Sequence, residues 1–587
     1  MKKSIIIGAL AVVGLSFASC DDFLDDNRYP LTSEVDNARF WNNESNVEGE
    51  ANLFLSTVKG YGNYRANIQS TSISGQGDFY FSTLSDDQVG RTYAMQNWAY
   101  TQAPSTDGNY VNPYRTIRHA MLVMKGVGGS TLDEPVKNHY IGVARLFRAL
   151  ATYDLVRRYG DVIWIDQLVE PTDDDILYGP RQDRDLVMDK VLEDLDFAIA
   201  NISTNSDMFN FSKDMARAAK AEICLYEGTF CKYRTQDVNG KAPNIERANK
   251  YLTECVKACE PLMSTYTLAA DYADIYRCIS TGAFAGVSEI ITGKAFKDQQ
   301  MMHQLVAYTC SSTQICGITR DAFESFLFTD GKPAATTAEN NTDLGEMDAE
   351  GNYSIANLLQ VRDKRLAYLT DPYVYCKGMT WTRAGAGAMD ATTGYGVAKY
   401  DNTAMPVYNR ITIGQNYTCG PVYWLSVVLL EYAEAKAELG TITDNDLNQS
   451  LNLLYARAGL PAQTVASLSA INDPANNMGV SSLLWEVRRC RRCELMCDNN
   501  FRYWDLIRWH KLDLLDSNQH PNVMLGANMT ASKVWTDPEL KKDLKFSTDG
   551  YLDGSLGVRA YNPKYYLFPI PQNQLNLNSE LKQNPGW

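Results

Sequence analysis

Apolar side chains recur every three or four positions in one stretch near the C-terminus. They are Val480, Leu483, Leu484, Val487, Cys490, Cys493 and Cys497. On a helix this spacing forms a single stripe that faces a core. The stretch is followed by Asn499 and Asn500 and then by a second run of mixed apolar and charged residues, 501–509. Because asparagine tolerates the left-handed conformation of a tight turn, the pattern predicts two helices joined at this pair.

Charged residues occupy the other faces of these two predicted helices. The first carries arginines at positions 488, 489, 491 and 492, within reach of Glu486 and Glu494. In the second, Arg502 has Asp498 four positions before it and Asp505 three positions after it. Oppositely charged residues three or four positions apart are neighbours on a helix surface. The spacing therefore predicts an arginine–carboxylate ladder that ties the last helices together.

Three earlier segments look like variants of one helix. They are residues 144–160, 216–228 and 430–440, and each is followed by a companion helical pattern, at 183–202, 245–262 and 446–459. Each of the three places alanines where helices can approach closely and ends in a glycine suited to a helix C-cap. Such helix pairs predict a mostly α-helical fold with tetratricopeptide-like stacking, although the spacing is too irregular for a pure solenoid.

The helical pattern is interrupted over about residues 60–113 and 270–420, where the sequence is rich in glycine, threonine and aromatic residues. Long loops of this makeup tend to carry function. The candidate ligand-binding residues are Trp98, Tyr100, Tyr93, Asp87 and Arg91 in the first segment, and Trp381 and Tyr395 in the second. Each ring has a structural alternative, as part of the core or as a loop anchor.

The N-terminus has the makeup of a secretory signal. Met1 and two lysines precede an apolar run over residues 5–17, which is too short to span a membrane as a helix, and Ala18 and Ser19 precede Cys20. This end resembles a bacterial lipobox, which predicts a signal peptide over residues 1–19, lipidation of Cys20 and a tether over residues 20–35. The acidic cluster directly after Cys20 resembles a surface-export signal. Ordinary cleavage near a chance cysteine is the alternative.

Metal chemistry has weak support in the sequence. The chain has 5 His and 13 Cys, and no pair of histidines has metal-ligand spacing. The three cysteines of the apolar stripe have helical spacing, so we interpret them as buried free thiols, with a bridge or a metal as the alternative. The acidic residues Asp343, Asp348 and Glu350 could bind calcium, but their spacing fits no EF-hand loop, which favours a solvated acidic loop.

Composition narrows the class of partner. A chain of 587 residues with 45% hydrophobic content is globular and can bury a large core. Its net charge of −15 argues against binding to nucleic acid, which requires a basic surface. The 35 Tyr and 10 Trp exceed what a core needs and are compatible with a flat, polar ligand such as a carbohydrate.

Several marks in a fixed order resemble the RagB/SusD-like nutrient-binding lipoproteins of Bacteroidetes. They are the lipobox at Cys20, the segments 144–162, 180–196, 432–435, 457–459, 491–495 and 502–509, and the tail 566–587. The resemblance covers essentially the whole chain after residue 20. One departure concerns the turn before the last helix, where the family usually has Glu-Gly and this chain has Asp498, Asn499 and Asn500.

The resemblance implies a SusD-like fold over residues 36–587, with a helical scaffold and loop-rich ligand-binding insertions. It also implies an outer-membrane, lipid-anchored protein facing the cell exterior, which binds oligosaccharides or, in some members, peptides. The implied partner is a TonB-dependent transporter of the SusC type. By this likeness the protein binds and does not catalyse, and no resident cofactor is expected.

An enzyme is the rival class of function. A surface glycosidase would use two carboxylates, but no motif selects a pair among the 70 acidic residues. The chain also lacks a G-x-S-x-G elbow, which weakens other hydrolase hypotheses. A purely structural surface subunit would account for the anchor but not for the ring-rich loops.

Overall fold

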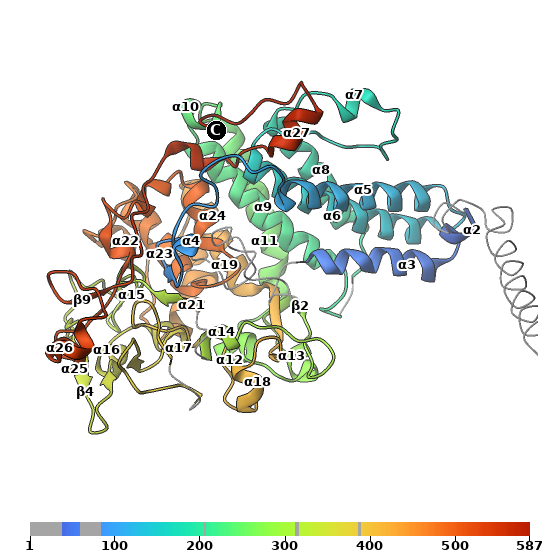
Figure 1. Ribbon diagram of the computed structural model, residues 1–587. Coiled ribbons are helices and arrows are strands. Elements are labelled where there is room, and N and C mark those ends of the chain that lie inside the picture. Colours follow the sequence, from blue (N-terminus) through green and yellow to red (C-terminus); the bar gives the residue numbers. More distant parts are fainter. Residues whose placement is uncertain (1–37, 59–83, 205–206, 311–315, 385–388) are drawn as a thin grey trace, which may run out of the picture.

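The computed structural model describes residues 38–58, 84–204, 207–310, 316–384 and 389–587. Long helices form one side of it, and a region of loops, short helices and short strands lies beside them (Figure 1). One large hydrophobic core contains residues from both regions. The predicted fold class, mostly α with loop-rich segments, is confirmed. Cys20, the signal peptide and the tether lie outside the described residues, as does the part of the first loop-rich segment before Leu84.

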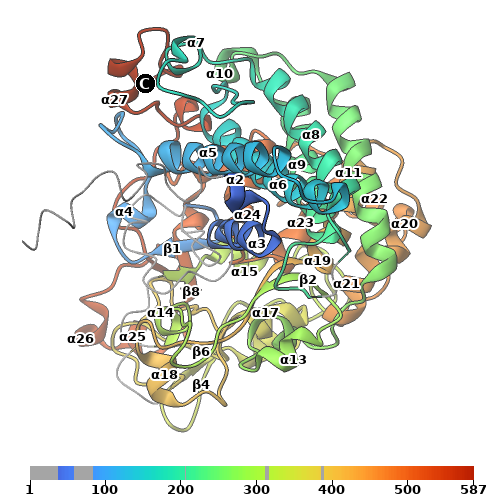
Figure 2. The same cartoon turned by 90° about the vertical axis from the view of Figure 1, so that its right-hand side faces the viewer.

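Long helices that follow one another in the chain form the scaffold. They are α5 (Gly108–Gly128), α6 (Glu134–Tyr159), α8 (Arg184–Asn201), α9 (Lys213–Tyr233) and α11 (Ile245–Thr265). Each packs against the next, and α11 also packs against α19 (Leu425–Glu438). Helix α3 (Glu44–Asn52) lies against α5 and α6 (Figures 1 and 2). This arrangement confirms the predicted stacking of helix pairs.

Two glycines that were both predicted to end a helix have different roles. Gly160 follows the last residue of α6 with φ of 74°, a left-handed conformation that only glycine adopts easily. Gly228 instead lies inside α9, so its predicted role as a C-cap is wrong. A Cβ at Gly228 would lie 2.7 Å from Cγ of Leu252 in α11. The missing side chain lets the two helices cross closely.

Helix α5 also begins earlier than the sequence indicated. The pattern predicted a helical start at Tyr114, after Pro113, but α5 starts at Gly108 and includes the proline. The side chain of Asp107 accepts a hydrogen bond from the backbone N–H of Asn109 and caps the new end. Pro113 is the sixth residue of α5, so the helix lacks the hydrogen bond that an N–H at this position would donate to the carbonyl of Asn109.

Short elements fill the rest of the described chain. The short α-helices are α2 (Ala38–Trp41), α4 (Tyr93–Gln96), α7 (Asp174–Leu177), α10 (Gln236–Asn239), α12 (Tyr272–Tyr276), α13 (Thr281–Ala285), α14 (Ala307–Cys310), α15 (Arg320–Glu324), α16 (Ala356–Gln360), α17 (Lys364–Leu369), α18 (Val407–Ile411), α20 (Asp444–Gln449), α21 (Leu451–Ala458), α22 (Val465–Ala470), α25 (Lys533–Thr536), α26 (Pro538–Lys541) and α27 (Gln572–Leu577). The 3₁₀-helices are η2 (Leu53–Thr57), η4 (Leu512–Leu515), η5 (Pro521–Val523) and η6 (Pro563–Tyr566).

The strands form small antiparallel pairings rather than one sheet. They are β1 (Gln88–Gly90) with β3 (Cys316–Ile318), β2 (Ile290–Lys294) with β7 (Gly420–Trp424), β4 (Glu346–Met347) with β5 (Tyr353–Ser354), β5 with β6 (Tyr373–Val374), and β8 (Leu525–Asn528) with β9 (Tyr551–Asp553). In the first pairing, Gln88 lies opposite Ile318. This register holds residues 86 and 87 beside the start of α15.

The two predicted C-terminal helices are α23 (Ser482–Glu494) and α24 (Phe501–Arg508). Between them, Asn499 and Asn500 have φ of 41° and 58°, so both adopt the left-handed conformation expected at the corner. The cysteines of the apolar stripe are free and buried, which confirms their interpretation as core thiols.

Most of the ion pairs predicted for the charge ladder do not form. On α23 one predicted local pair forms, between Arg489 and Glu486 at 2.9 Å. Glu494 accepts hydrogen bonds from Arg365 and Arg457, which come from other parts of the chain. All four arginines of α23 are buried, because the rest of the protein covers the faces that the pattern left polar. Their partners are therefore set by tertiary contacts.

The predicted tie between the last two helices does exist. Nε of Arg491 in α23 lies 2.9 Å from a carboxylate oxygen of Asp505 in α24, and Arg508 binds the other oxygen at 2.8 Å. Asp498, which was expected to face Arg502, instead accepts hydrogen bonds from Lys399 and Tyr276.

Candidate functional site

A cleft of 400 Å³ opens along one side of α23, and we call it the α23 cleft. It is lined by Asp86, Asp321, Glu324, Ser325, Pro333, Ala334, Ala335, Asp473, Pro474, Ala475, Asn477, Trp485, Arg489, Arg492, Arg502, Gln519, His520, Pro521 and Asn522. These residues come from α23, α24, α15, η5 and the loops around residues 86, 334, 475 and 520. Segments far apart in the sequence therefore meet at this site.

One wall of the cleft is a buried ion-pair cluster around Asp86. Arg502 donates two hydrogen bonds to its carboxylate, at 2.7 and 2.6 Å. Arg492 donates to the carboxylate of Asp87 at 2.7 Å and lies 2.8 Å from a carboxylate oxygen of Asp321. Burial raises the pKa of Asp86, but the positive charges of Arg492 and Arg502 outweigh this and hold the pKa below its ordinary value. Asp86 is therefore ionised at neutral pH.

A second wall presents an indole ring. Trp485 is half-buried, and its ring N–H donates to Asp473 at 3.0 Å, which fixes the orientation of the ring. Arg489 binds the same carboxylate and lies 5.5 Å from the centre of the indole ring. Arg489 also pairs with Glu486. Burial and the charge of Asp473 raise the pKa of Glu486 to about 7, against the opposing effect of Arg489. A flat apolar face thus stands among polar groups.

Local structure explains why these groups converge. The register of β1 with β3 brings residues 86 and 87 to the start of α15, and the backbone N–H of Thr319 donates to the carbonyl of Asp87 at 2.9 Å. The left-handed corner at Asn499 and Asn500 turns α24 so that Arg502 reaches the same point as Arg492 from α23. The cleft depends on this corner.

Three candidates of the first loop-rich segment, Asp87, Arg91 and Tyr93, take different positions. Asp87 belongs to the ion-pair cluster of the cleft, is 1% exposed, and has a pKa raised by burial despite the charge of Arg492. Arg91 and Tyr93 are exposed at the start of α4. A Cβ at Gly557 would lie 2.7 Å from the ring of Tyr93, so this ring covers the glycine between the exposed side chains of Leu556 and Val558.

Trp98 and Tyr100 hold their loop against the C-terminal tail. The indole of Trp98 stacks on Tyr565, with ring centres 4.2 Å apart, and its N–H donates to the carbonyl of Ala560 at 2.6 Å. The hydroxyl of Tyr100 donates to Asp107 at 2.6 Å. Both rings are more than nine-tenths buried. In this conformation they have the loop-anchor role that the sequence left open as an alternative.

The two candidates of the second loop-rich segment differ in accessibility. Tyr395 is 4% exposed and stacks on Phe323 with ring centres 4.4 Å apart. Trp381 is half-buried and lies against Tyr373 and Tyr375, with ring centres 5.1 and 5.4 Å away. Trp381 thus remains accessible in part, whereas Tyr395 is a core residue in this conformation.

Sequence reasoning did not select Trp485 or Asp86. Trp485 lies on α23 outside the apolar stripe, and a bulky ring outside such a stripe is a weak signal for an exposed aromatic face. Asp86 differed from its neighbour Asp87 in no local respect. Its pairing with a residue 416 positions away is invisible in the sequence.

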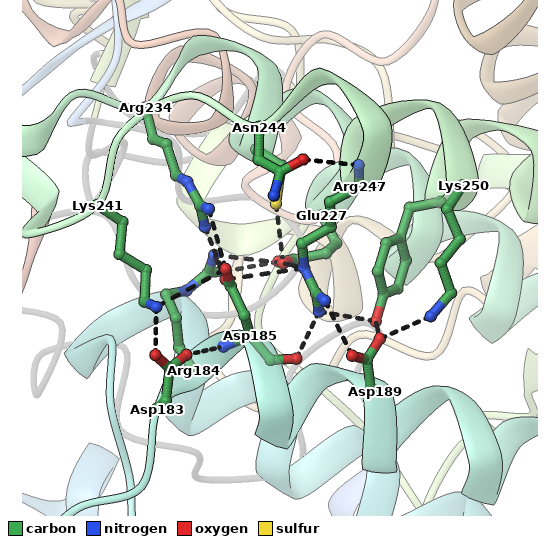
Figure 3. Close-up of polar contacts among 12 residues, drawn as sticks. Asp183, Arg184, Asp185, Asp189, Glu227, Arg234, Lys241, Asn244, Arg247 and Lys250 are labelled. Atoms are coloured by element: carbon green, nitrogen blue, oxygen red, sulfur yellow. Dashed lines mark hydrogen bonds and ion pairs between the residues drawn. The ribbon is translucent and has the colours of Figure 1, made fainter.

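In the described part of the chain, one group of three side chains is close enough to share a metal ion. It consists of Asp185, Glu227 and Cys231 (Figure 3). Arg184 donates to Glu227 at 2.6 Å, and Arg234 donates two hydrogen bonds to Asp185, at 2.6 and 2.9 Å. These arginines neutralise the carboxylates, so the group does not fit a cation.

The pKa shifts agree with a structural role for this cluster. Burial raises the pKa of Asp185, but its hydrogen bond with Arg234 and the surrounding arginines lower it to about 2. Burial and the charge of Glu227 raise the pKa of the Cys231 thiol well above its ordinary range, so the thiol stays protonated and donates to Glu227 at 3.1 Å. Arg247 of α11 lies 3.5 Å from a carboxylate oxygen of Glu227 and 3.7 Å from one of Asp185, so the cluster joins α8, α9 and α11. Asp343, Asp348 and Glu350 form no comparable group among the described residues.

No helix in the described ranges is long and apolar enough to cross a membrane.

Comparison with known proteins identifies a family that the C-terminal part of the chain matches. Residues 308–587, which include α23 and α24, match the model of the SusD family. This part of the chain, just under half of it, is similar to the SusD family. A SusD-like protein from Bacteroides ovatus is 25% identical over 281 residues, which cover 47% of this chain and 47% of that relative. The match thus spans about half the length of this curated relative.

Solved structures extend the similarity to nearly the whole fold. A SusD-like carbohydrate binding protein from Bacteroides fragilis is 19% identical, with a TM-score of 0.66 over 92% of this chain and 100% of that one. Surface glycan-binding protein A from Bacteroides fluxus is 13% identical, with a TM-score of 0.57 over 93% of this chain and 100% of that one. At these identities the comparisons establish a shared SusD fold, of which the α23 cleft is a feature in this chain.

Proposed function

We propose that this protein with a SusD fold binds glycans at the α23 cleft and delivers them to a SusC-like TonB-dependent transporter, without catalysing a reaction. Two structural relatives are described as binding carbohydrate or glycan, which supports this class of ligand. The observation that carries the proposal is the half-buried indole of Trp485 in a concave site with amide and carboxylate side chains.

The chemistry of the cleft suits a sugar. The carbon-bound hydrogens of a pyranose ring form an apolar face that stacks on an aromatic ring, while its hydroxyls donate and accept hydrogen bonds. Trp485 supplies the ring, and its bond to Asp473 holds it in place before the ligand arrives. Asn477, Gln519 and Asn522 supply amides that both donate and accept.

Further ring contacts are proposed at the accessible members of the original candidates. Tyr93 is 56% exposed, with Arg91 beside it in the sequence, and Trp381 is half-buried at the surface. Tyr93 begins the short helix α4 and Trp381 lies on a loop, and an extended ligand can reach both rings. Trp98, Tyr100 and Tyr395 would contact a glycan only after leaving their present packing, so we place them behind the ligand-contacting residues.

Binding is tested with a glycan array followed by calorimetry on the purified protein and on three variants. Trp485→Ala should weaken binding by at least about tenfold, equivalent to about 1.4 kcal/mol, because buried aromatic anchors carry much of a binding energy. Trp485→Phe keeps a stacking ring and should retain more affinity. Trp164→Ala, which removes another half-buried indole from a different surface, is the matched control and should bind normally.

The outcomes separate the hypotheses. If Trp485→Ala and Trp164→Ala bind equally well, the cleft is not the site. New reducing ends during incubation with a glycan would show catalysis and overturn the binding role. Binding to peptides with no binding to any glycan would change the class of ligand.

Anchoring and delivery are proposed from the N-terminal sequence and the family. Residues 1–19 would be removed, Cys20 would carry the lipid, and residues 20–35 would tether a single SusD-like domain, residues 36–587, at the exterior of the outer membrane. A fatty-acid label should be incorporated into the native chain and not into Cys20→Ala. An outer-membrane barrel should be recovered with the tagged protein from cross-linked cells, and its absence would contradict the delivery role.

A further inference from the structure

Each arginine that lines the α23 cleft is already bound to carboxylates of the protein. Arg502 is held by both oxygens of Asp86, at 2.7 and 2.6 Å. Arg492 donates to Asp87 at 2.7 Å and lies 2.8 Å from Asp321. These two side chains are 6% and 8% exposed. Nε and one terminal nitrogen of each guanidinium are therefore held by the wall of the cleft, and the positive charge of each group is paired with a protein carboxylate.

The third arginine is committed in the same way. Arg489 binds Asp473 and lies 2.9 Å from Glu486, and the residue is 5% exposed. Its Nε makes no hydrogen bond among the described residues, but this atom is buried and cannot meet a ligand from the cleft. A carboxylate or sulfate on a ligand would meet a guanidinium whose charge Asp473 already neutralises, so it would gain little attraction there.

The balance of charge also opposes an anion. Four carboxylate residues line the cleft, Asp86, Asp321, Glu324 and Asp473, against the three arginines, and no lysine is among the residues that line it. The whole chain carries a net charge of −15. Negative charge on the protein weakens the approach and binding of an anionic ligand.

The remaining groups on the cleft surface suit uncharged hydroxyls. Asn477 and Gln519 are exposed, Asn522 is half-buried, and each amide both donates and accepts hydrogen bonds. Together with the indole face of Trp485 they recognise a ring and its hydroxyls without requiring a charge on the ligand.

We infer that the α23 cleft is selective for neutral oligosaccharides and rejects glycans that carry uronate or sulfate groups. This inference rests on the proposed function, that the cleft binds a glycan, and adds the class of that glycan. The rejection follows from the occupied arginines and the surplus of carboxylates.

The experiment compares two sets of probes on the same purified protein. Neutral xylo-, malto-, galacto-, manno- and fructo-oligosaccharides are measured beside oligogalacturonides, alginate oligosaccharides and sulfated glycosaminoglycan oligosaccharides. Oligogalacturonides and their fully methyl-esterified forms provide a pair with one backbone and different charge. Every probe that binds should be neutral, and the Kd of each anionic probe should be at least about 100-fold higher than that of the best neutral probe. Added salt should leave the affinity for the neutral ligand nearly unchanged.

Two results have different meanings. Tight binding of an anionic glycan, lost in Trp485→Ala and retained in Trp164→Ala, would overturn the inference while leaving the proposed function in place. Binding of no probe in either set would instead overturn the proposed function. A strong loss of affinity with added salt would also contradict selection for a neutral ligand, because screening acts on charge pairs between protein and ligand.

Discussion

The buried pair of Asp86 and Arg502 offers a direct test of the account of the α23 cleft. Asp86 is 3% exposed and accepts two hydrogen bonds from Arg502. In the variant Asp86→Ala, the Arg502 guanidinium loses the carboxylate that accepts both of these bonds. Arg492 keeps Asp87 and Asp321 as partners. The substitution therefore isolates one buried cation.

Removing one partner of a buried ion pair typically costs about 3–5 kcal/mol, because the other charge stays buried without compensation. That loss is a large fraction of the roughly 5–15 kcal/mol by which folded proteins are usually stable. The double variant with Asp86→Ala and Arg502→Met removes both charges, so it should recover much of the loss. The contrast between the single and the double variant is the signature of an unpaired buried charge.

The pair also predicts how stability depends on pH. The pKa of Asp86 is lower in the folded protein than its ordinary value. Its contribution to the free energy of unfolding is therefore complete above the unfolded pKa of about 3.9 and is lost as the pH falls towards the folded value. Asp86→Ala should differ most from the parent protein at neutral pH, and the difference should shrink in acid.

Urea unfolding followed by tryptophan fluorescence measures the effect. The matched control is Glu193→Ala, which removes one partner of the exposed pair with Lys190. Exposed pairs contribute about 0–1 kcal/mol, so this control should unfold close to the parent protein. If Asp86→Ala loses no more stability than Glu193→Ala, the ion-pair cluster does not hold the first loop-rich segment to α23.

Gly228→Ala should cost about 1–3 kcal/mol of stability, because the new Cβ would lie 2.7 Å from Cγ of Leu252. Gly49→Ala in α3, where the new Cβ would meet nothing within 4 Å, should instead stabilise the protein by about 0.5–1 kcal/mol. Equal melting temperatures of these two variants would contradict the close crossing of α9 and α11. Burial raises the pKa of Glu486 to about 7, so the folded state binds this proton more tightly than the unfolded state. The free energy of unfolding should therefore fall as the pH rises from about 5 to about 8, and Glu486→Gln should make this pH dependence weaker in urea unfolding. An unchanged pH dependence would show that Glu486 does not titrate in this range. Burial raises the pKa of Cys490 to about 12 and that of Cys493 to about 11, so both thiols should resist a thiol reagent until the protein is denatured. Mass spectrometry measures the labelling, and modification of either cysteine in the native state would place that residue at the surface.

The sequence alone determined most of the long helices and the corner between the last two, but it misplaced the start of α5 and the end of α9. The apolar stripe of α23 recurs within a few positions, so its buried cysteines were predictable from local spacing. The left-handed corner was predictable because two adjacent asparagines accept positive φ more readily than most residues. Order along the chain also sufficed to predict the stacking of successive helices, since neighbours in sequence usually pack together.

Only the tertiary structure decided where the charges and rings went. Arg502 pairs with Asp86 of the first loop-rich segment rather than with Asp498 or Asp505, which are closer to it in the sequence. Trp98 and Tyr395 resemble Tyr93 in the sequence, but Tyr565 and Phe323 cover them while Tyr93 stays exposed. Periodicity fixes which face of a helix a side chain occupies and carries no information about what distant segment covers that face. The α23 cleft is built from such distant segments, so Trp485 became a candidate only once they were in place.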